Sequence, residues 1–107
     1  MASALIHMPA TAKPGEVIEV RALIAHTMET GFRPGPDGKL LPRDIIRKFE
    51  CRYNGKTVIS TELHPAMSAN PYIAFFIKAT ASGPLEFTWT GDNAFTQTEK
   101  KQLTVQQ

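Results

Sequence analysis

The sequence lacks most of the residues and patterns that indicate a chemical function. Its 107 residues include a single cysteine, Cys51, which excludes an internal disulfide framework. It has neither a Gly-x-Ser-x-Gly nucleophile elbow nor a glycine-rich phosphate loop. No apolar run approaches the roughly 20 residues that a membrane-spanning helix requires. The first nine residues do not combine a basic segment with an apolar one, so we expect no signal peptide of its own.

The charge of the chain is also too balanced to indicate a polyanionic partner. Twelve basic residues face ten acidic ones, and no basic stripe with interleaved aromatic residues occurs. Proteins that bind nucleic acids or anionic membranes concentrate their positive charge on one face. We therefore expect no nucleic-acid and no membrane partner. The length and the ordinary globular composition predict one domain over residues 1–107.

Apolar and polar residues alternate along much of the chain, and turn formers separate the alternating segments. This alternation is typical of strands that bury one face. Asn54-Gly55 predicts a tight hairpin, because both residues tolerate the positive φ of a type I′ turn. Residues 72–80 are apolar on both faces, as in a central strand. The expected strands are residues 5–8, 16–26, 44–53, 56–63, 72–80, 85–90 and 94–105.

Seven strands at this spacing, with no convincing helix, predict an all-β fold. The best architecture is an immunoglobulin-like β-sandwich of about seven antiparallel strands. The single cysteine lies in the alternating segment Phe49–Tyr53, on the side that we expect to face the core. A catalytic thiolate needs a nearby base or cation, and alternation sends Arg52 to the opposite face. The sequence therefore predicts a protein that is not an enzyme.

A copper-binding electron carrier is the alternative that the sequence leaves open. Such proteins also use a small β-sandwich, with histidine, cysteine and methionine ligands. His26, Cys51, His64 and Met67 supply these residue types. In blue-copper proteins the cysteine, the second histidine and the methionine usually share one loop, whereas Cys51 lies in a predicted strand. We therefore predict no metal and no cofactor, and keep copper as the alternative.

Two connecting segments carry apolar residues that a loop does not need. Met28 and Phe32 lie in the first, and Tyr72 ends the second. Exposed apolar residues with a polar rim are typical of protein interfaces, so these three are candidate partner contacts. The loops could equally fold back and cap the ends of the sandwich, and the sequence does not decide between the two.

Basic residues bracket the glycine- and proline-rich segment that follows Phe32. They could attract an anion or an acidic partner, although a solvated hairpin tip is the simpler interpretation. The members of this basic cluster are Arg33, Lys39, Arg43, Arg47 and Lys48.

Several blocks of the sequence form a recognisable pattern over nearly the whole chain. They are His26–Arg33, Leu41–Arg43, Ile46, Phe49–Gly55, Leu63–Tyr72, Ser82-Gly83 and Phe87–Trp89. The most specific parts are Met-Glu-Thr-Gly and Ser-Ala-Asn-Pro-Tyr. In this order the blocks closely resemble the SoxZ family, the Z subunits of the bacterial SoxYZ sulfur-oxidation carrier complex. Thr27 departs from the proline expected in many members.

The resemblance implies a function that the residues alone do not show. SoxZ-like proteins are immunoglobulin-like sandwiches that pair with SoxY, whose C-terminal cysteine arm carries covalent sulfur intermediates of thiosulfate oxidation. It therefore implies a non-catalytic scaffold subunit in a SoxY heterodimer, which presents its sulfur to other enzymes of the pathway. It also implies a periplasmic complex exported by means of SoxY. Homo-oligomers of the isolated chain remain open.

Overall fold

The computed structural model describes residues 4–26, 28–63 and 70–106. These ranges contain eight strands and no helix, which confirms an all-β fold. The strands are β1 (Ala4–His7), β2 (Thr11–Ala12), β3 (Val17–Ile24), β4 (Ile46–Tyr53), β5 (Lys56–Glu62), β6 (Tyr72–Lys78), β7 (Gly83–Gly91) and β8 (Thr96–Val105).

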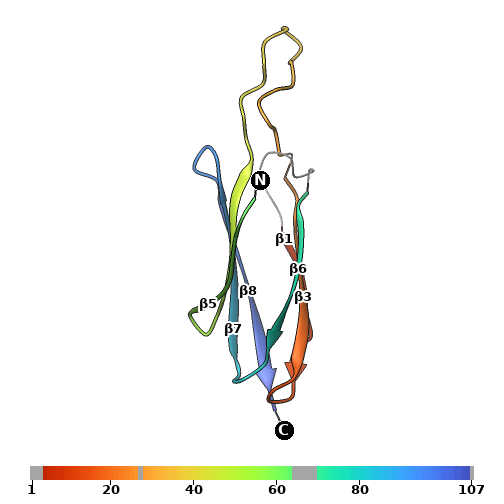
Figure 1. Cartoon of the computed structure of the whole chain (residues 1–107), viewed down its shortest axis with the longest axis vertical. Helices are drawn as coiled ribbons and strands as arrows, with labels where there is room; N and C mark the ends of the chain where they lie inside the picture. The colour runs from red at the N-terminus through yellow and green to blue at the C-terminus, as the bar shows by residue number, and fades with distance from the viewer. Residues whose placement is uncertain (1–3, 27, 64–69, 107) are drawn as a thin grey trace.

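The strands form two sheets that face each other (Figure 1). One sheet has the order β1-β3-β6, and the other has the order β2-β8-β7-β4-β5. Every pairing is antiparallel except that of β2 with β8, which is parallel. The β-sandwich expected from the sequence is therefore confirmed.

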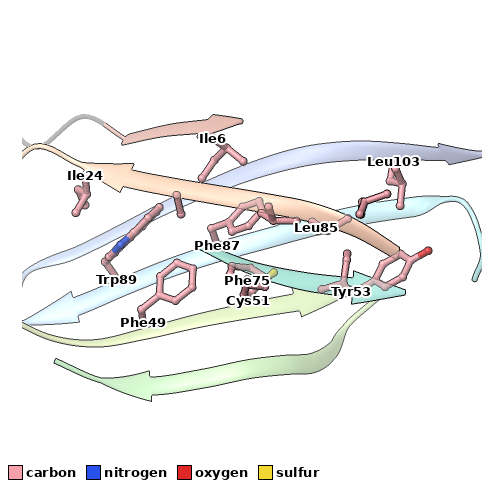
Figure 2. Close-up of a cluster of buried hydrophobic side chains, with 14 of the residues drawn as sticks. Ile6, Ile24, Phe49, Cys51, Tyr53, Phe75, Leu85, Phe87, Trp89 and Leu103 are labelled. Carbon is pink, nitrogen blue, oxygen red and sulfur yellow. The ribbon is translucent and has the colours of Figure 1, made fainter. Parts of the chain in front are cut away.

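The inner residues of both sheets form one apolar core. Phe49 is at its centre, with ring centroids 5.1 Å from Trp89, 6.0 Å from Phe75 and 6.4 Å from Phe87 (Figure 2). Alternation explains this placement, because β3 and β7 are buried at every second position, and so is β4 from Phe49 to Tyr53. Aromatic and aliphatic burial is thus the main source of stability in the sandwich.

The predicted hairpin between β4 and β5 is also confirmed. Asn54 and Gly55 have φ values of 53° and 80°, the left-handed conformations that a type I′ turn requires. On β4, register shifts interrupt the pairing between Cys51 and Arg52 toward β5, and between Ile46 and Lys48 toward β7.

The structure differs from the sequence predictions in three respects. An eighth strand, β2, is present, and its two residues are too few to show a period. The strand expected from Asp44 begins at Ile46, because Asp44 instead pairs with Glu29. Residues 72–80 were expected to form a central strand, yet β6 lies at an edge: within the described ranges it pairs only with β3.

Between β3 and β4 the chain leaves the sandwich as a long, narrow extension, residues 29–44 (Figure 1). Isolated bridges hold its two sides together, one between Glu29 and Asp44 and one between Pro34 and Leu40. The molecule measures 61 × 20 × 20 Å, so it is about three times as long as it is wide.

Candidate docking surface

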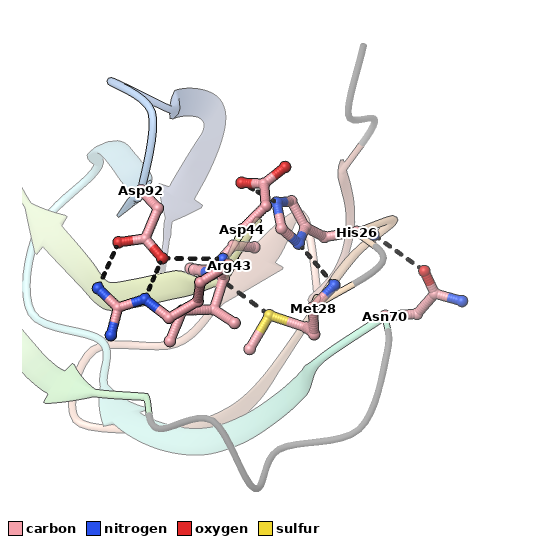
Figure 3. A network of polar contacts seen from close by, with 8 residues as sticks. His26, Met28, Arg43, Asp44, Asn70 and Asp92 are labelled. Atoms are coloured by element: carbon pink, nitrogen blue, oxygen red, sulfur yellow. Dashed lines mark hydrogen bonds and ion pairs between the residues drawn. The ribbon is translucent and has the colours of Figure 1, made fainter. Parts of the chain in front are cut away.

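The base of the extension is fixed to the sandwich by an arginine–aspartate pair (Figure 3). Arg43 Nε donates to Asp92 Oδ2 at 2.8 Å, and Arg43 Nη2 donates to Asp92 Oδ1 at 3.0 Å. The Ile45 N–H also donates to Asp92 Oδ2, at 3.3 Å. Partial burial opposes ionisation of Asp92, but these hydrogen bonds and the arginine charge outweigh it and lower the pKa of the carboxyl group.

A second ion pair lies farther along the extension. Arg33 Nη2 donates to Glu29 Oε1 at 2.5 Å, and this hydrogen bond lowers the pKa of the Glu29 carboxyl group. The Glu29 and Asp44 backbones exchange two hydrogen bonds, of 2.8 and 2.7 Å. Two members of the predicted basic cluster, Arg33 and Arg43, therefore have carboxylate partners within the chain, and these partners neutralise part of the positive charge of the cluster.

Met28 is in the core, at the point where the extension leaves β3. Its side chain is 5% exposed, and its Sδ accepts the Ile46 N–H at 3.3 Å. The Met28 N–H donates to His26 Nδ1 at 3.0 Å (Figure 3). The sequence left open whether this loop contacts a partner or folds back onto the sandwich, and the buried side chain of Met28 does fold back onto the sandwich. Whether any of the three candidate residues touches a partner stays a prediction.

Phe32, by contrast, is 80% exposed on the extension. The nearby Leu40 is 63% exposed, and the sequence analysis did not single it out. Neither side chain belongs to the buried core, so neither contributes much to the stability of the sandwich. The extension therefore carries two large apolar groups into solvent.

The outward side of the β1-β3-β6 sheet, here called the outer face, is the second exposed apolar region. Leu5, Leu23 and Tyr72 are directly opposite one another on the three strands. Tyr72 is 53% exposed, and Phe76, farther along β6, is 67% exposed. One face of a solvated antiparallel sheet is normally polar. An outer face with this many apolar side chains indicates a surface that a partner covers.

Charged groups also occur on the outer face, and they partly neutralise one another. Arg21 Nη2 is 2.8 Å from Glu19 Oε1, and both residues lie on β3 between the apolar side chains. The face therefore combines apolar anchors with a paired charge, a composition typical of protein interfaces.

Sequence reasoning found Tyr72 and missed Leu5, Leu23 and Phe76. The signal was present in residues 72–77, which are apolar at successive positions rather than at alternate ones. That pattern predicted a strand buried on both faces. The structure buries only one face of β6, so the remaining apolar side chains of the strand are exposed on the outer face.

Cys51 is fully buried on β4, which confirms its predicted place in the core (Figure 2). Burial, reinforced by the neighbouring Glu50 charge, raises the pKa of its thiol to about 12. Since the thiolate is the reactive form, both the burial and the raised pKa disfavour Cys51 as a nucleophile or as a sulfur acceptor.

The copper alternative gains no support from the described part of the chain. His64 and Met67 lie outside the described residues. His26 Nδ1 accepts the Met28 N–H, and its Nε2 is 3.7 Å from Asp44 Oδ1. Among residues 4–26, 28–63 and 70–106, no three His, Cys, Asp or Glu side chains gather as a metal site would require.

The same described residues include no helix that is long and apolar enough to cross a membrane.

Comparison with protein families gives one match that extends over most of the chain. A family model described as "Sulphur oxidation protein SoxZ" matches residues 6–102. No curated protein matches the sequence.

Solved structures match the fold at low sequence identity. A superoxide reductase (neelaredoxin) from Ignicoccus hospitalis is 19% identical with a TM-score of 0.76, over 97% of this chain and 80% of that one. A putative superoxide reductase from Thermotoga maritima is 14% identical with a TM-score of 0.70, over 97% and 86%. The sulfur carrier protein SoxY from Chlorobium limicola is 11% identical with a TM-score of 0.68, over 97% and 79%. These three likenesses establish the sandwich fold alone.

Proposed function

Because the chain belongs to the SoxZ family of sulfur oxidation proteins, we propose that it is the non-catalytic scaffold subunit of a SoxYZ carrier complex. In this role it pairs with a SoxY subunit, whose C-terminal cysteine arm holds the covalent sulfur intermediates. SoxY presents that sulfur to the other enzymes of the pathway. We further propose that the pair works in the periplasm and that SoxY supplies the export signal.

The outer face is the observation that carries this proposal. Leu5, Leu23, Tyr72 and Phe76 are all exposed there, on strands whose other side forms the core. A standard protein–protein interface buries roughly 1,600 Å² in total, and large apolar and aromatic side chains are its usual anchors. A scaffold subunit needs such a surface, whereas an enzyme of this size needs a reactive site.

The state of Cys51 supports the non-catalytic part of the proposal. It is the only thiol of the chain, and it is buried and protonated at neutral pH. This supports the proposal that the covalent sulfur resides on the partner.

Co-expression tests the proposal directly. The chain is produced with a SoxY that bears the cysteine arm, and the product is examined by size-exclusion chromatography and intact mass spectrometry. We expect a one-to-one complex in which sulfur adducts occur only on SoxY. Elution of the chain alone, or copper or a sulfur adduct on it, would exclude the scaffold role.

Single substitutions then test the surface. Tyr72→Asp and Phe32→Asp introduce a charge at an exposed apolar site, and Thr96→Asp does the same at an exposed site of the other sheet. We expect Tyr72→Asp to weaken the complex by about tenfold or more, as for an interface anchor, and Thr96→Asp to leave it unchanged. Phe32→Asp decides whether the extension takes part in SoxY binding.

A further inference from the structure

The backbone of β6 presents unpaired hydrogen-bonding groups at its free edge. The Pro71 C=O accepts the Ile24 N–H at 3.3 Å, and the Ala79 N–H donates to the Glu16 C=O at 2.8 Å. Antiparallel pairing makes alternate residues face the same neighbour, so the odd-numbered residues of β6 bond to β3. The N–H and C=O groups of the even-numbered residues then point away from β3, toward an edge with which no described strand pairs.

This edge is regular and carries little charge. The seven residues of β6 pair with β3 without a register shift, and the strand contains no proline. Its one charged residue, Lys78, is at the end. Proteins usually protect an exposed edge with charges, prolines or bulges, since an open edge pairs readily with other strands.

The nearby edge of the other sheet has that protection. β5 carries Lys56 and Glu62, and a register shift interrupts its pairing with β4. Only one of the two edges is therefore suited to receive a strand.

A groove also lies between the two edges, near the β4–β5 hairpin. It has a volume of about 550 Å³, and its lining combines the apolar Val58, Phe76 and Ile77 with Lys56 and Lys78. A strand added to β6 would place alternate side chains toward this groove and the others beside Tyr72 and Phe76 on the outer face.

We propose that the free edge of β6 receives an antiparallel edge strand from a partner of the same sandwich fold, so that the β1-β3-β6 sheet continues into that partner. The inference rests on the proposed pairing with SoxY and specifies how that pairing is made. Four residues, Tyr72, Ala74, Phe76 and Lys78, each contribute one donor and one acceptor. The incoming strand carries apolar residues on its outer side, because these meet Tyr72 and Phe76.

The fold comparison supports this choice of occupant. The SoxY from Chlorobium limicola matches 97% of this chain with a TM-score of 0.68, so the SoxY fold includes a counterpart of the β1-β3-β6 sheet. Two subunits of one fold can join equivalent edges about an approximate two-fold axis, as the isologous interfaces of dimers do.

Amide hydrogen exchange provides a residue-level test. In the isolated chain we expect the amides of residues 73, 75 and 77 to be protected and those of residues 74, 76 and 78 to exchange freely. On addition of SoxY, the even-numbered amides should become protected by about tenfold or more. Free exchange of these amides within an intact one-to-one complex would overturn the strand addition. Protection in the isolated chain that increases with its concentration would identify a second copy as the occupant and also overturn the proposal.

Two edge prolines give a matched pair of variants. Ala74→Pro removes a donor that points away from β3, so the β3–β6 pairing is kept and strand addition is blocked. Ser60→Pro is the control: the Leu63 N–H donates to the Arg47 C=O, so the Ser60 N–H points to the free side of β5. We expect Ala74→Pro to weaken SoxY binding by about tenfold or more, and Ser60→Pro to leave it unchanged.

The result separates this inference from the proposed function. If the native chain binds SoxY and Ala74→Pro binds equally well, the scaffold role stands and the strand addition is wrong. If the native chain does not bind SoxY, the proposed function fails before the edge is tested. Unchanged near-ultraviolet circular dichroism of Trp89 verifies that each variant is folded. If Ala74→Pro is not folded, Lys78→Pro replaces it, because this change also removes a donor that points away from β3 and keeps the apolar side chains of the outer face.

Discussion

The sandwich and the extension of residues 29–44 are stabilised by different physical forces. In the sandwich, aromatic side chains such as Phe49 and Trp89 are fully buried between two paired sheets. The extension has two isolated bridges and the ion pairs Arg33–Glu29 and Arg43–Asp92. Apolar burial does not depend on the ionisation of any group, whereas partly exposed ion pairs are lost on protonation and are screened by salt. The large apolar residues of the extension, Phe32 and Leu40, are exposed and contribute little to its stability.

Replacing one phenylalanine in each region should give the largest difference in the free energy of unfolding between the sandwich and the extension. Phe49→Ala leaves a cavity beside three aromatic rings, and we expect it to lower the free energy of unfolding by about 3–5 kcal/mol. Phe32→Ala removes an exposed side chain and should change it by no more than about 0.5 kcal/mol. Urea unfolding followed by the fluorescence of Trp89 measures both. A comparable loss for Phe32→Ala would mean that the extension packs as a second core.

Tyr53→Phe tests a polar contact at the end of the sandwich opposite the extension. The Tyr53 hydroxyl donates to the Ala81 C=O and accepts the N–H groups of Thr80 and Ala81, at 3.2 and 3.1 Å. Phenylalanine keeps the ring and leaves these backbone groups without the hydroxyl. We expect a loss of about 1–3 kcal/mol in the same unfolding measurement. A change near zero would show that solvent replaces the hydroxyl without cost.

We expect acid to loosen the extension before it affects the sandwich. Of the changes considered, this one should have the smallest effect on the free energy of unfolding of the whole chain. The pKa values of Glu29 and Asp92 are lowered in the folded chain, so the unfolded state binds more protons than the folded state in acid. Their contribution is present above the unfolded pKa values, about 4, and is lost as the pH falls through the lower folded values. Backbone order parameters measured by NMR at pH 6 and pH 3 should fall for residues 33–41 and stay constant in β3 and β7.

Arg43→Gln at pH 6 is the control for the acid experiment. It removes the guanidinium partner of Asp92 without protonating any other group, so it should reproduce part of the loosening. Order parameters that stay high in both conditions would show that backbone pairing alone holds the extension.

Alternation predicted most of the sandwich, because a strand that buries one face has apolar and polar residues at alternate positions in the sequence. The inward residues of β3, β4 and β7 show this alternation, and Asn54-Gly55 predicted the hairpin. The core position of Cys51 followed from the same period.

Sequence patterns are less informative where a position depends on distant residues. The sequence left two interpretations open for Met28, and the structure buries this residue, with its Sδ accepting the Ile46 N–H. β6 has the composition of a central strand but lies at an edge, because strand order is set by tertiary pairing. The contact roles proposed for Phe32 and Tyr72 depend on a second molecule and stay predictions.

The buried thiol of Cys51 has a consequence for sulfur traffic in the proposed complex. Sulfur–sulfur bonds exchange when an accessible thiolate attacks one of their sulfur atoms, so the rate depends on the thiolate fraction and the accessibility of the attacking group. With a pKa of about 12, the Cys51 sulfur is almost entirely protonated at neutral pH and is also shielded from solvent. If the chain pairs with a SoxY arm as proposed, Cys51 would not compete for the sulfur that the arm holds, because its thiol is buried and protonated.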